Sequence, residues 1–595
     1  MLSFFLKSKL YCIHDLFKIK EIMSMPKIKY RLKFPNRLTH FIHIEMEIHD
    51  IDSEELELIL PDWRPGRYEL TNYVANIEKI KAYNQGGSEL EINKNEKNKW
   101  AVHNPNAGPV LIRYAYYAFK MDAGSSYVDE EQIYINFINC LLYLPNRMSE
   151  SVEVFIDIPD SYKSTCSLSN VSGTTFLAKD YYELVDSPFL ASETLKCLTY
   201  HVADSEFNIV IQGDCPISDD KLIEDFRKFT EIQLHQMKGF PSDRFDFIIQ
   251  SLNYRHYHGV EHRNSTVLVL GPNTESNQVK YYEDLIGVAS HELFHAWNVT
   301  RIRPMELSPY EFSKENYYET GFITEGVTTY YGDLFLVRGE VFTEAQYFDE
   351  LNALFKRHFE NYGRHNLSLT ESSFDLWIDG YKKILPNRKV SIYVKGAILA
   401  FMLDLTIRKY SNNKQSIDDL TFELWEKFGQ KEIGYTKQDV YDLISKYAGA
   451  LAGGFINDYY EGVEPVEEQL SELLIDIGCE LVSKNHPEKQ ASLFGFRGSL
   501  NEGFFEITEI APSSIAEELL SIGDKILSIN GNDINENSLL NMKAPCTFSI
   551  DRNAKIKSVE LVSTRDKFYQ LHEIRRSESS SEEAKSNYKK WIKGK

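Results

Sequence analysis

Apolar and polar residues alternate with a period of two through the first third of the chain. Residues 42–48 carry Ile, Ile, Met and Ile at every second position, and residues 152–158 repeat the pattern with Val, Val, Ile and Ile. Such alternation is typical of β-strands with one buried face. Clusters of Pro, Gly and Asn, such as residues 61–67 and 84–88, indicate turns between the runs. We therefore predict an antiparallel, sandwich-like β domain over residues 27–205.

The period of the pattern becomes helical after residue 216. Leu222, Phe226 and Phe229 fall on one face of a helix that ends near Gly239. A mainly α domain is therefore predicted over residues 206–462. Its further helical patterns lie at residues 281–300, 321–338, 342–360, 391–410, 417–428 and 436–448.

Short strand patterns return in the last quarter of the chain. The apolar run at 504–510 and the turn-rich stretch at 522–531 predict a small β domain over residues 463–566. Residues 567–595 are rich in Ser, Glu and Lys, so we expect a charged tail that is either a solvated helix or disordered. The chain is thus predicted to be a multidomain α+β protein.

Residues 1–26 form a leader whose apolar run is interrupted by Lys7 and Lys9 and has no small-residue cleavage site after it. We expect this leader to be disordered or not native, with translation starting at Met23 or Met25, rather than an export signal. The seven cysteines lie far apart and form no CxxC pair, which favours reduced thiols in a cytoplasm. No run of apolar residues reaches the length that a membrane span needs.

The net charge of −22 is spread along the chain, and no stripe of Lys and Arg stands out. Nucleic-acid binders carry such a basic footprint, so nucleic acid is not an expected partner. Neither the charge distribution nor the residue pattern indicates which oligomeric state the chain adopts.

The clearest chemistry lies in His291, Glu292 and His295, an H-E-x-x-H pattern within an apolar helix. Positions i and i+4 share one helix face, so the two imidazoles can bind one metal ion, and zinc suits neutral imidazole. Glu292 lies one step round the helix, where a carboxylate can serve as general base. The pattern also arises by chance, but burying three such side chains without a partner is costly. We therefore predict one zinc ion per chain.

A catalytic zinc site needs a third protein ligand and one open position. Glu325, at the start of the next helical pattern, is the best candidate; it could also be a carboxylate stabilised by the helix dipole. Glu315 and Glu319 are rivals in the preceding polar loop, where solvated carboxylates are expected. Asp333 is a weak candidate for the acceptor that holds a ligand histidine.

Three stretches resemble the glycyl aminopeptidase family of PDZ-containing zinc peptidases, which has a thermolysin-like gluzincin catalytic domain. Residues 291–304 read H-E-L-F-H-A-W-N-V-T-R-I-R-P, and residues 324–338 read T-E-G-V-T-T-Y-Y-G-D-L-F-L-V-R. Residues 60–68, L-P-D-W-R-P-G-R-Y, are similar to a signature of the family's N-terminal β domain. The resemblance covers most of the chain.

The resemblance implies that His291, His295 and Glu325 are the zinc ligands and that Glu292 is the general base and proton shuttle. The stretch S-I-Y-V-K-G is similar to the family's Y-x-K-G segment, which implies that Tyr393 donates to the developing oxyanion. From its sequence alone, this tyrosine would be a packing residue among 36 tyrosines.

The stretch H-G-V-E-H, residues 258–262, is similar to a family loop that lines the substrate and binds its free α-amine. The resemblance implies amine recognition by Glu261 and close backbone approach at Gly259. The sequence departs from the family pattern at His258, which stands where the first glycine is usual. Without the resemblance, Glu261 reads as a solvated loop carboxylate.

Residues 493–531 resemble a PDZ domain, with a carboxylate-binding loop at Leu493–Phe496 beside an exposed strand edge. A C-terminal peptide is therefore a possible ligand. The expected activity is that of a zinc aminopeptidase which removes N-terminal residues, with Gly or Ala implied by the resemblance alone. Two alternatives remain: an endopeptidase with the same zinc chemistry, and a non-catalytic PDZ peptide-binding protein with a relict zinc fold.

Overall fold

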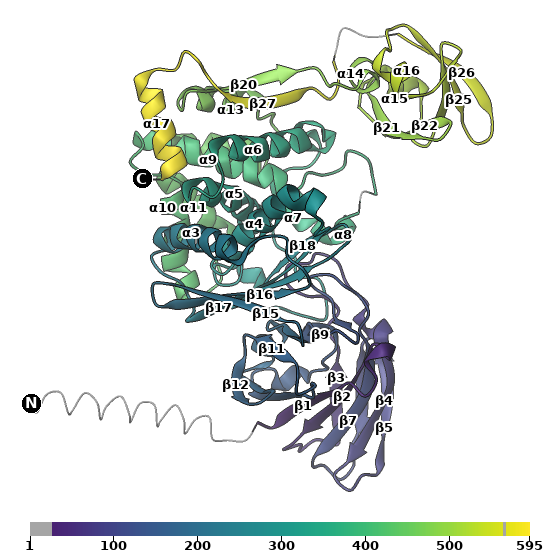
Figure 1. Ribbon diagram of the computed structural model, residues 1–595, viewed down its shortest axis with the longest axis vertical. Coiled ribbons are helices and arrows are strands. Elements are labelled where there is room, and N and C mark those ends of the chain that lie inside the picture. Colours follow the sequence, from purple (N-terminus) through teal and green to yellow (C-terminus); the bar gives the residue numbers. More distant parts are fainter. Residues whose placement is uncertain (1–25, 383, 563–566, 595) are drawn as a thin grey trace, which may run out of the picture. The chain divides into compact units, whose positions relative to one another are not determined.

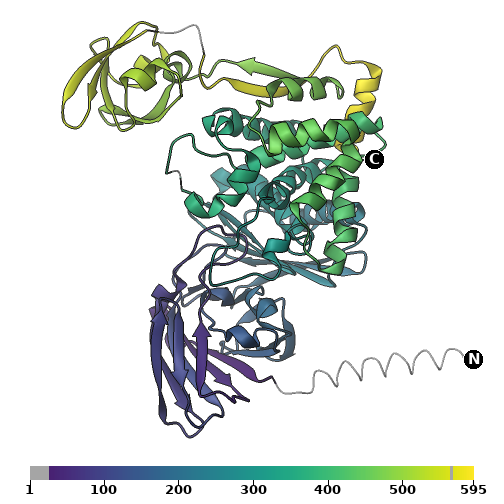
Figure 2. The same ribbon diagram turned by 180° about the vertical axis from the view of Figure 1, so that it is seen from behind.

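The computed structural model describes residues 26–382, 384–562 and 567–594. The chain forms two compact units (Figures 1 and 2). Of the described residues, the first unit contains 26–223, Ser242–Leu285 and Glu311–Glu315. The second contains Glu224–Pro241, Ile286–Tyr310 and the described residues from Asn316 onward. The predicted leader, residues 1–26, lies almost wholly outside the described residues.

A ten-stranded sheet dominates the first unit, drawn in purple in Figure 1. The predicted alternation on β2 is confirmed, because Ile42, Ile44, Met46 and Ile48 are all buried while their neighbours are more exposed. Most pairs are antiparallel, but β1 and β10 pair in parallel. The order is β12 (Ser169–Ser172), β13 (Thr175–Ala178), β10 (Val152–Ile156), β1 (Ile28–Lys33), β2 (Phe41–Ile48), β7 (Val110–Tyr117), β4 (Ile77–Asn84), β5 (Glu89–Glu96), β6 (Lys99–His103) and β3 (Glu55–Ile59).

Two further sheets complete the first unit. A four-stranded sheet has the order β11 (Lys163–Cys166), β14 (Phe189–Ser192), β9 (Gln132–Ile135) and β8 (Tyr127–Val128). A five-stranded sheet has the order β15 (Lys196–Val202), β16 (Ser205–Gln212), β17 (Arg244–Ser251), β19 (Ser265–Gly271) and β18 (His256–Glu261). Strand β18, at the edge of this sheet, carries Glu261.

The central strands of the five-stranded sheet fall in the part of the chain that we predicted to be mainly α. Strand β16 pairs in parallel with β17, which pairs in parallel with β19. Strands in parallel arrangements are buried on both faces and show no alternation. In β17, seven of the eight residues are buried, so the period-two signal is absent.

Most of the predicted helices are confirmed to within a few residues, but the one predicted over residues 281–300 ends at Phe294. Threonine capping boxes begin α6 and α11: Thr343 pairs with Gln346, and Thr436 with Asp439. The helices of this region are α3 (Asp219–Met237), α4 (Gln278–Phe294), the π-helical η7 (Phe322–Val327), α5 (Thr328–Arg338), α6 (Glu344–Phe359), α7 (Leu369–Phe374), α8 (Leu376–Asp379), α9 (Val394–Ser411), α10 (Ile417–Lys427), α11 (Lys437–Ala448), α12 (Ala452–Phe455) and α13 (Glu467–Ile475). Within the described part of the chain, no helix is long and apolar enough to cross a membrane.

The C-terminal β domain contains β21 (Phe496–Asn501), β22 (Phe504–Ile510), β23 (Lys525–Ile529), β25 (Cys546–Asp551) and β26 (Ile556–Leu561) around an apolar core. The expectation of a loop at Leu493–Phe496 is wrong. Helix α14 (Lys489–Phe494) extends to Phe494, and the Gly495 N–H donates to the Ala491 carbonyl. Gly495 ends this helix in the left-handed region with φ of 81°, as a C-terminal glycine does.

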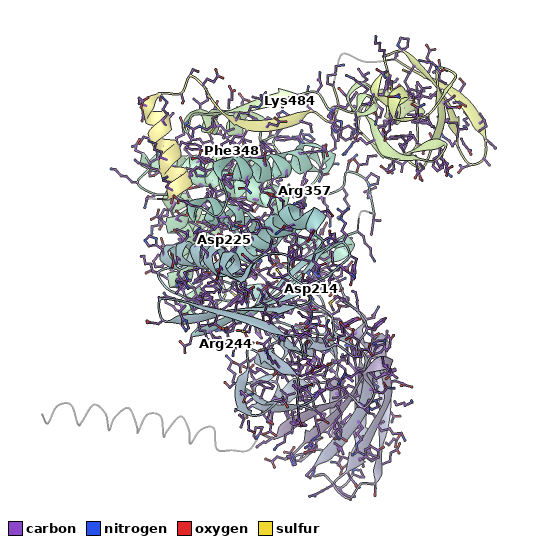
Figure 3. All side chains as sticks on the ribbon, viewed as in Figure 1. Asp214, Asp225, Arg244, Phe348, Arg357 and Lys484 are labelled. Carbon is purple, nitrogen blue, oxygen red and sulfur yellow. The ribbon has the colours of Figure 1, made fainter. Side chains whose placement is uncertain are left out.

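The expectation of a solvated or disordered tail is also wrong. Strand β27 (Leu571–Arg576) pairs with β20 (Cys479–Lys484), and Lys484, labelled in Figure 3, lies 2.5 Å from Glu573. Helix α17 (Glu582–Lys593) buries Trp591 completely, and its indole N–H donates to the Tyr330 hydroxyl at 2.9 Å. The charged residues of α17 mark its solvent face, and widely spaced aromatic residues mark the face that packs.

Candidate metal centre

The last turn of helix α4 and the residue directly after it place two imidazoles side by side: His291 lies in the helix, and His295 follows its last residue, Phe294. The Nε2 atoms of His291 and His295 lie 3.0 Å apart. His295 is 1% exposed, and Glu292, between them on the helix, is 6% exposed. An i, i+4 spacing on one helix face therefore brings two nitrogen ligands together in a buried place.

Glu325 offers the third candidate ligand atom. Its Oε2 lies 3.5 Å from the Nε2 of His295 and 3.9 Å from the Nε2 of His291. It is 3% exposed and lies in η7, a π-helical turn that leads directly into α5. Such turns are rare and are often found at functional sites.

These three residues fit a zinc ion. Four ligands at about 2.0–2.1 Å around a tetrahedral ion are separated from each other by about 3.3 Å. The observed separations of 3.0, 3.5 and 3.9 Å lie around that value. Two imidazoles and one carboxylate form a donor set that zinc takes in hydrolytic sites, with one position left for water. In the described part of the chain, His291, His295 and Glu325 form a candidate metal group.

The protonation state of the histidines suits a metal ligand. The Nδ1 of His295 lies 2.7 Å from the Asn298 carbonyl, which can only accept, so Nδ1 carries the proton and Nε2 presents its lone pair to the other ligands. The pKa of His291 is lowered to about 3, mainly by burial. The neighbouring His295 contributes to the lowering, and the negative charge of Glu325 opposes it. The His291 ring is therefore neutral at neutral pH.

Asn298 holds the two ligand-bearing elements together and was not predicted from the sequence. Its side-chain amide donates to the Ile323 carbonyl at 2.7 Å and to the Thr328 hydroxyl at 3.0 Å. These acceptors flank Glu325 on both sides. Asn298 therefore ties the segment after α4 to the turn that carries the third ligand. The sequence carries no periodic signal for this role, because the partners of Asn298 lie on another element.

Small residues let the helices around the site approach closely. A Cβ added to Gly332 of α5 would lie 3.2 Å from the Cβ of His291, so α5 passes directly beside the ligand. A Cβ added to Gly326 would lie 2.6 Å from the Cα of Gly396 in α9. The Ser290 hydroxyl donates to the Gly332 carbonyl at 2.7 Å and strengthens the first of these contacts.

Tyr393 comes directly before α9, the helix that packs against η7. A Cβ added to Gly326 would lie 3.0 Å from the Ile392 carbonyl oxygen. The backbone beside Tyr393 therefore packs closely against the turn that carries Glu325. Tyr393 is half-buried. The fold thus brings the residue predicted to donate to the oxyanion to the same pair of elements as the third ligand.

The rival ligands are placed elsewhere. Glu319 is exposed and pairs with Lys437 at 2.9 Å. Glu315 is half-buried, and it is not in the candidate metal group. Asp333 was a candidate acceptor for a ligand histidine, but the acceptor for His295 is the Asn298 carbonyl. Burial, with a contribution from Glu350, raises the pKa of Asp333 to about 8.

The predicted amine-binding residues lie on β18 in the first unit. Glu261 is 8% exposed, so it is not a solvated loop carboxylate. Gly66, in the turn of residues 61–67, leaves room for it: a Cβ on Gly66 would lie 2.4 and 2.7 Å from the two carboxylate oxygens. The His258 Nδ1 accepts from the Ala123 N–H at 3.3 Å, and burial and Arg64 lower the pKa of His258 to about 4.

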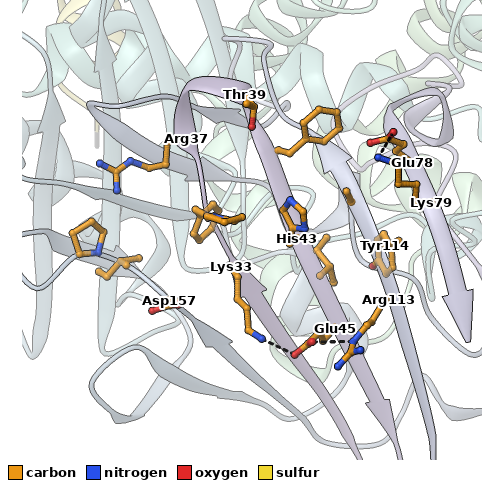
Figure 4. Close-up of a pocket in the computed structure, with 17 residues that line it drawn as sticks. Lys33, Arg37, Thr39, His43, Glu45, Glu78, Lys79, Arg113, Tyr114 and Asp157 are labelled. Atoms are coloured by element: carbon orange, nitrogen blue, oxygen red, sulfur yellow. Dashed lines mark hydrogen bonds and ion pairs between the residues drawn. The ribbon is translucent and has the colours of Figure 1, made fainter. Parts of the chain in front are cut away.

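The ten-stranded sheet carries a separate pocket of about 800 Å³ (Figure 4). Its central carboxylate, Glu45, lies 2.9 Å from Lys33 and 3.0 Å from Arg113. Lys79 pairs with Glu78 at 2.8 Å. Glu45 is thus held between two cations, and Lys79 is paired with one carboxylate.

Three segments of the chain match described protein families. Residues 29–193 match the Peptidase M61 N-terminal domain, and residues 284–399 match M61 glycyl aminopeptidase. Residues 483–544 match the PDZ domain. The second match contains all three candidate metal ligands as well as Tyr393.

Solved structures also resemble the chain. An aminopeptidase N family protein from Idiomarina loihiensis is 24% identical with a TM-score of 0.87, over 95% of this chain and 100% of that chain. The two proteins therefore share a fold. An M1 zinc metallopeptidase variant from Deinococcus radiodurans, bound to a Tyr-Ser-Ala substrate, is 13% identical with a TM-score of 0.46, over 74% of this chain and 94% of that chain. No curated protein matches the chain in sequence.

Proposed function

Because the chain belongs to the M61 glycyl aminopeptidase family of metallopeptidases, with that family's N-terminal domain and a PDZ domain, we propose that it is a zinc-dependent aminopeptidase acting on peptides with a free N-terminus. One observation carries the proposal: the ligand atoms of His291, His295 and Glu325 meet within 3.0–3.9 Å on buried elements. The proposed zinc stoichiometry is one ion per chain.

Zinc held by these residues would supply Lewis-acid chemistry, polarising the scissile carbonyl and acidifying a water. Glu292 is the general base in this proposal, because it lies between the two histidines on α4 and is buried. Its carboxylate takes a proton from the attacking water and delivers it to the leaving amine nitrogen. A carboxylate kept from bulk water returns that proton to the substrate instead of losing it to solvent.

Tyr393 is the second catalytic group in this proposal. Its phenol O–H donates to the carbonyl oxygen as negative charge develops there. Such a donor stabilises the transition state more than the ground state, so its effect falls on kcat. The support is its place before α9, beside the turn that carries Glu325.

Glu261 is proposed to bind the α-ammonium of the substrate and so to select a terminal residue. Its burial and its place beside Gly66 support a fixed carboxylate on the edge strand β18. Gly259, two residues earlier on the same strand, is proposed to let the substrate backbone approach. We further propose small N-terminal residues, Gly or Ala, as preferred substrates, and a C-terminal peptide as the ligand of the PDZ domain.

The chemical part of the proposal is tested with Glu292→Gln. The expected result is hydrolysis of a Gly-initiated peptide slowed by at least about 100-fold, with zinc content equal to that of the wild type, because the base is not a ligand. Hydrolysis at the wild-type rate would overturn the assigned mechanism. Absence of hydrolysis by the zinc-loaded wild type on any peptide, with retained PDZ-type binding, would favour the relict alternative.

A further inference from the structure

Three basic side chains on different elements indicate a second ligand site within the helical region. Lys395 lies in the first turn of α9, His358 near the end of α6, and Arg364 in η8 (Tyr362–His365). Helix α6 packs against both α9 and η8, so the three side chains belong to neighbouring elements. None of them is a metal ligand, and the proposed reaction uses none of them.

Two of these side chains are almost fully enclosed. Lys395 is 1% exposed and His358 is 3% exposed. The Nζ of Lys395, the Nε2 of His358 and the Nε of Arg364 are each buried and have no hydrogen-bond partner among the described residues. Buried polar groups are almost always paired, so three orphaned nitrogen atoms in one region call for an explanation such as a bound ion.

The three groups act on each other electrostatically. Burial lowers the pKa of His358 well below its ordinary value, and the charges of Arg364 and Lys395 lower it further. Burial, with the nearby charge of Arg364, lowers the pKa of Lys395 to about 8. Lys395 is therefore still mainly charged at pH 7, and the charge that acts on it most is another cation.

One carboxylate faces the cluster. The Oε1 of Glu467, at the start of α13, accepts from the Nη1 of Arg364 at 2.8 Å. The negative charge of Glu467 also opposes the lowering of the pKa of His365 and of His572, the other histidines near Arg364. Glu467 therefore balances Arg364, and its Oε2 is buried without a hydrogen-bond partner among the described residues. Arg364 alone is the charge that acts on Lys395, so Lys395 is a buried cation without a counter-charge, which is costly.

We propose that Lys395, His358 and Arg364 form an internal site for a small monovalent anion of the size of chloride. Lys395 and Arg364 can only donate, and the neutral His358 ring can donate through its Nε2, so a ligand that bridges the three groups accepts. An anion also balances the charge of Lys395. A water molecule would satisfy the hydrogen bonds but would leave that charge uncompensated. The almost complete burial of Lys395 and His358 excludes large organic anions.

The site is tested by thermal unfolding of the full zinc-loaded chain at pH 7 in sodium chloride and in sodium gluconate at equal ionic strength. Gluconate is too large to enter. We expect a higher Tm in chloride, with a rise that saturates as the chloride concentration increases. An equal Tm in the two salts would overturn the proposal.

Two variants separate this site from other chloride effects. Lys395→Met keeps the length of the side chain but removes its charge, so it should lose the chloride-dependent rise. It should also unfold no earlier than the wild type in gluconate. Lys409→Met, on the exposed face of the same helix, should keep the rise. A rise of the same size in Lys395→Met, as chloride binding at zinc would produce, contradicts the proposal.

A second measurement does not depend on how the variants fold. Wild-type crystals grown in sodium bromide should show an anomalous peak within hydrogen-bond distance of the Lys395 Nζ. Solvent density there without an anomalous signal would assign a water molecule and overturn the anion site. The proposal is independent of the aminopeptidase activity, because both measurements detect binding alone.

Discussion

The Nε2 of His295 lies 3.5 Å from the Oε2 of Glu325, although two different elements carry these residues. Glu325 thereby joins His291 and His295 in a site with three candidate ligands. This site depends on the turn η7, on the amide of Asn298 and on the close approach of Gly326 to Gly396.

Removing the third ligand should weaken metal binding most. Glu325→Gln replaces an anionic ligand with a neutral amide, so zinc affinity should fall by at least about 100-fold. This loss should be larger than the loss of zinc affinity caused by removing a residue that only hydrogen-bonds to a ligand. Competition with a chromophoric chelator measures this affinity. Glu319→Gln is the matched control, since Glu319 is exposed and pairs with Lys437. Equal zinc affinity in Glu325→Gln and the wild type would contradict the ligand assignment.

Asn298→Ala should loosen the site without removing a ligand. The buried Ile323 carbonyl and Thr328 hydroxyl would each lose a donor, so the zinc-free protein should lose about 1–3 kcal/mol of its free energy of unfolding. Zinc affinity should fall by about 10- to 100-fold, because Glu325 would no longer be held in place. Urea unfolding in EDTA and chelator competition measure the two effects. A stability loss with wild-type zinc affinity would show that Asn298 does not orient the ligands.

The site shows how far sequence reasoning reaches. His291 and His295 are recognisable because they are four residues apart at the end of one helical pattern, where spacing determines direction. The sequence context ranked Glu325 first among several candidate carboxylate ligands, and the family resemblance then selected it. Asn298 was missed because its partners lie on another element, and contacts between elements leave no period in the sequence.

The same reasoning applies to the fold. Strand β2 and the long helices were predictable because each has one buried face. Strand β17 was missed because both of its faces are buried. Helix α17 was taken for a solvated tail because its Ser, Glu and Lys residues dominate the composition, whereas Trp591 alone fills a large part of its buried face.

Gly326→Ala should disturb the packing of η7 on α9. The added methyl group would lie 2.6 Å from the Gly396 Cα, and a backbone atom cannot move aside as a flexible side chain does. The free energy of unfolding should fall by about 1–3 kcal/mol or more. Chemical denaturation measures it. Gly453→Ala is the control, because a Cβ there has no atom within 4 Å, and it should not destabilise the protein.

Gly66→Ala tests whether Glu261 acts as a fixed carboxylate. The methyl group would displace the Glu261 carboxylate, so kcat/KM for a peptide with a free amine should fall by about 10- to 100-fold. Gly87→Ala is a matched control for backbone strain, since φ is 80° at Gly87 and 74° at Gly66, but nothing lies within 4 Å of a Cβ at Gly87. Equal kinetics for the two variants would show that displacement of Glu261 is unimportant.

The most direct test of the aminopeptidase assignment compares one Gly-initiated peptide with its N-acetylated form on the zinc-loaded wild type. Acetylation removes the ammonium charge that Glu261 is proposed to bind, and losing one partner of a buried charge pair costs about 2–5 kcal/mol. We predict that kcat/KM falls by about 100-fold or more on acetylation, with the first residue as the released product. Equal kcat/KM for the two peptides, with cleavage at an internal bond, would contradict the account and identify an endopeptidase.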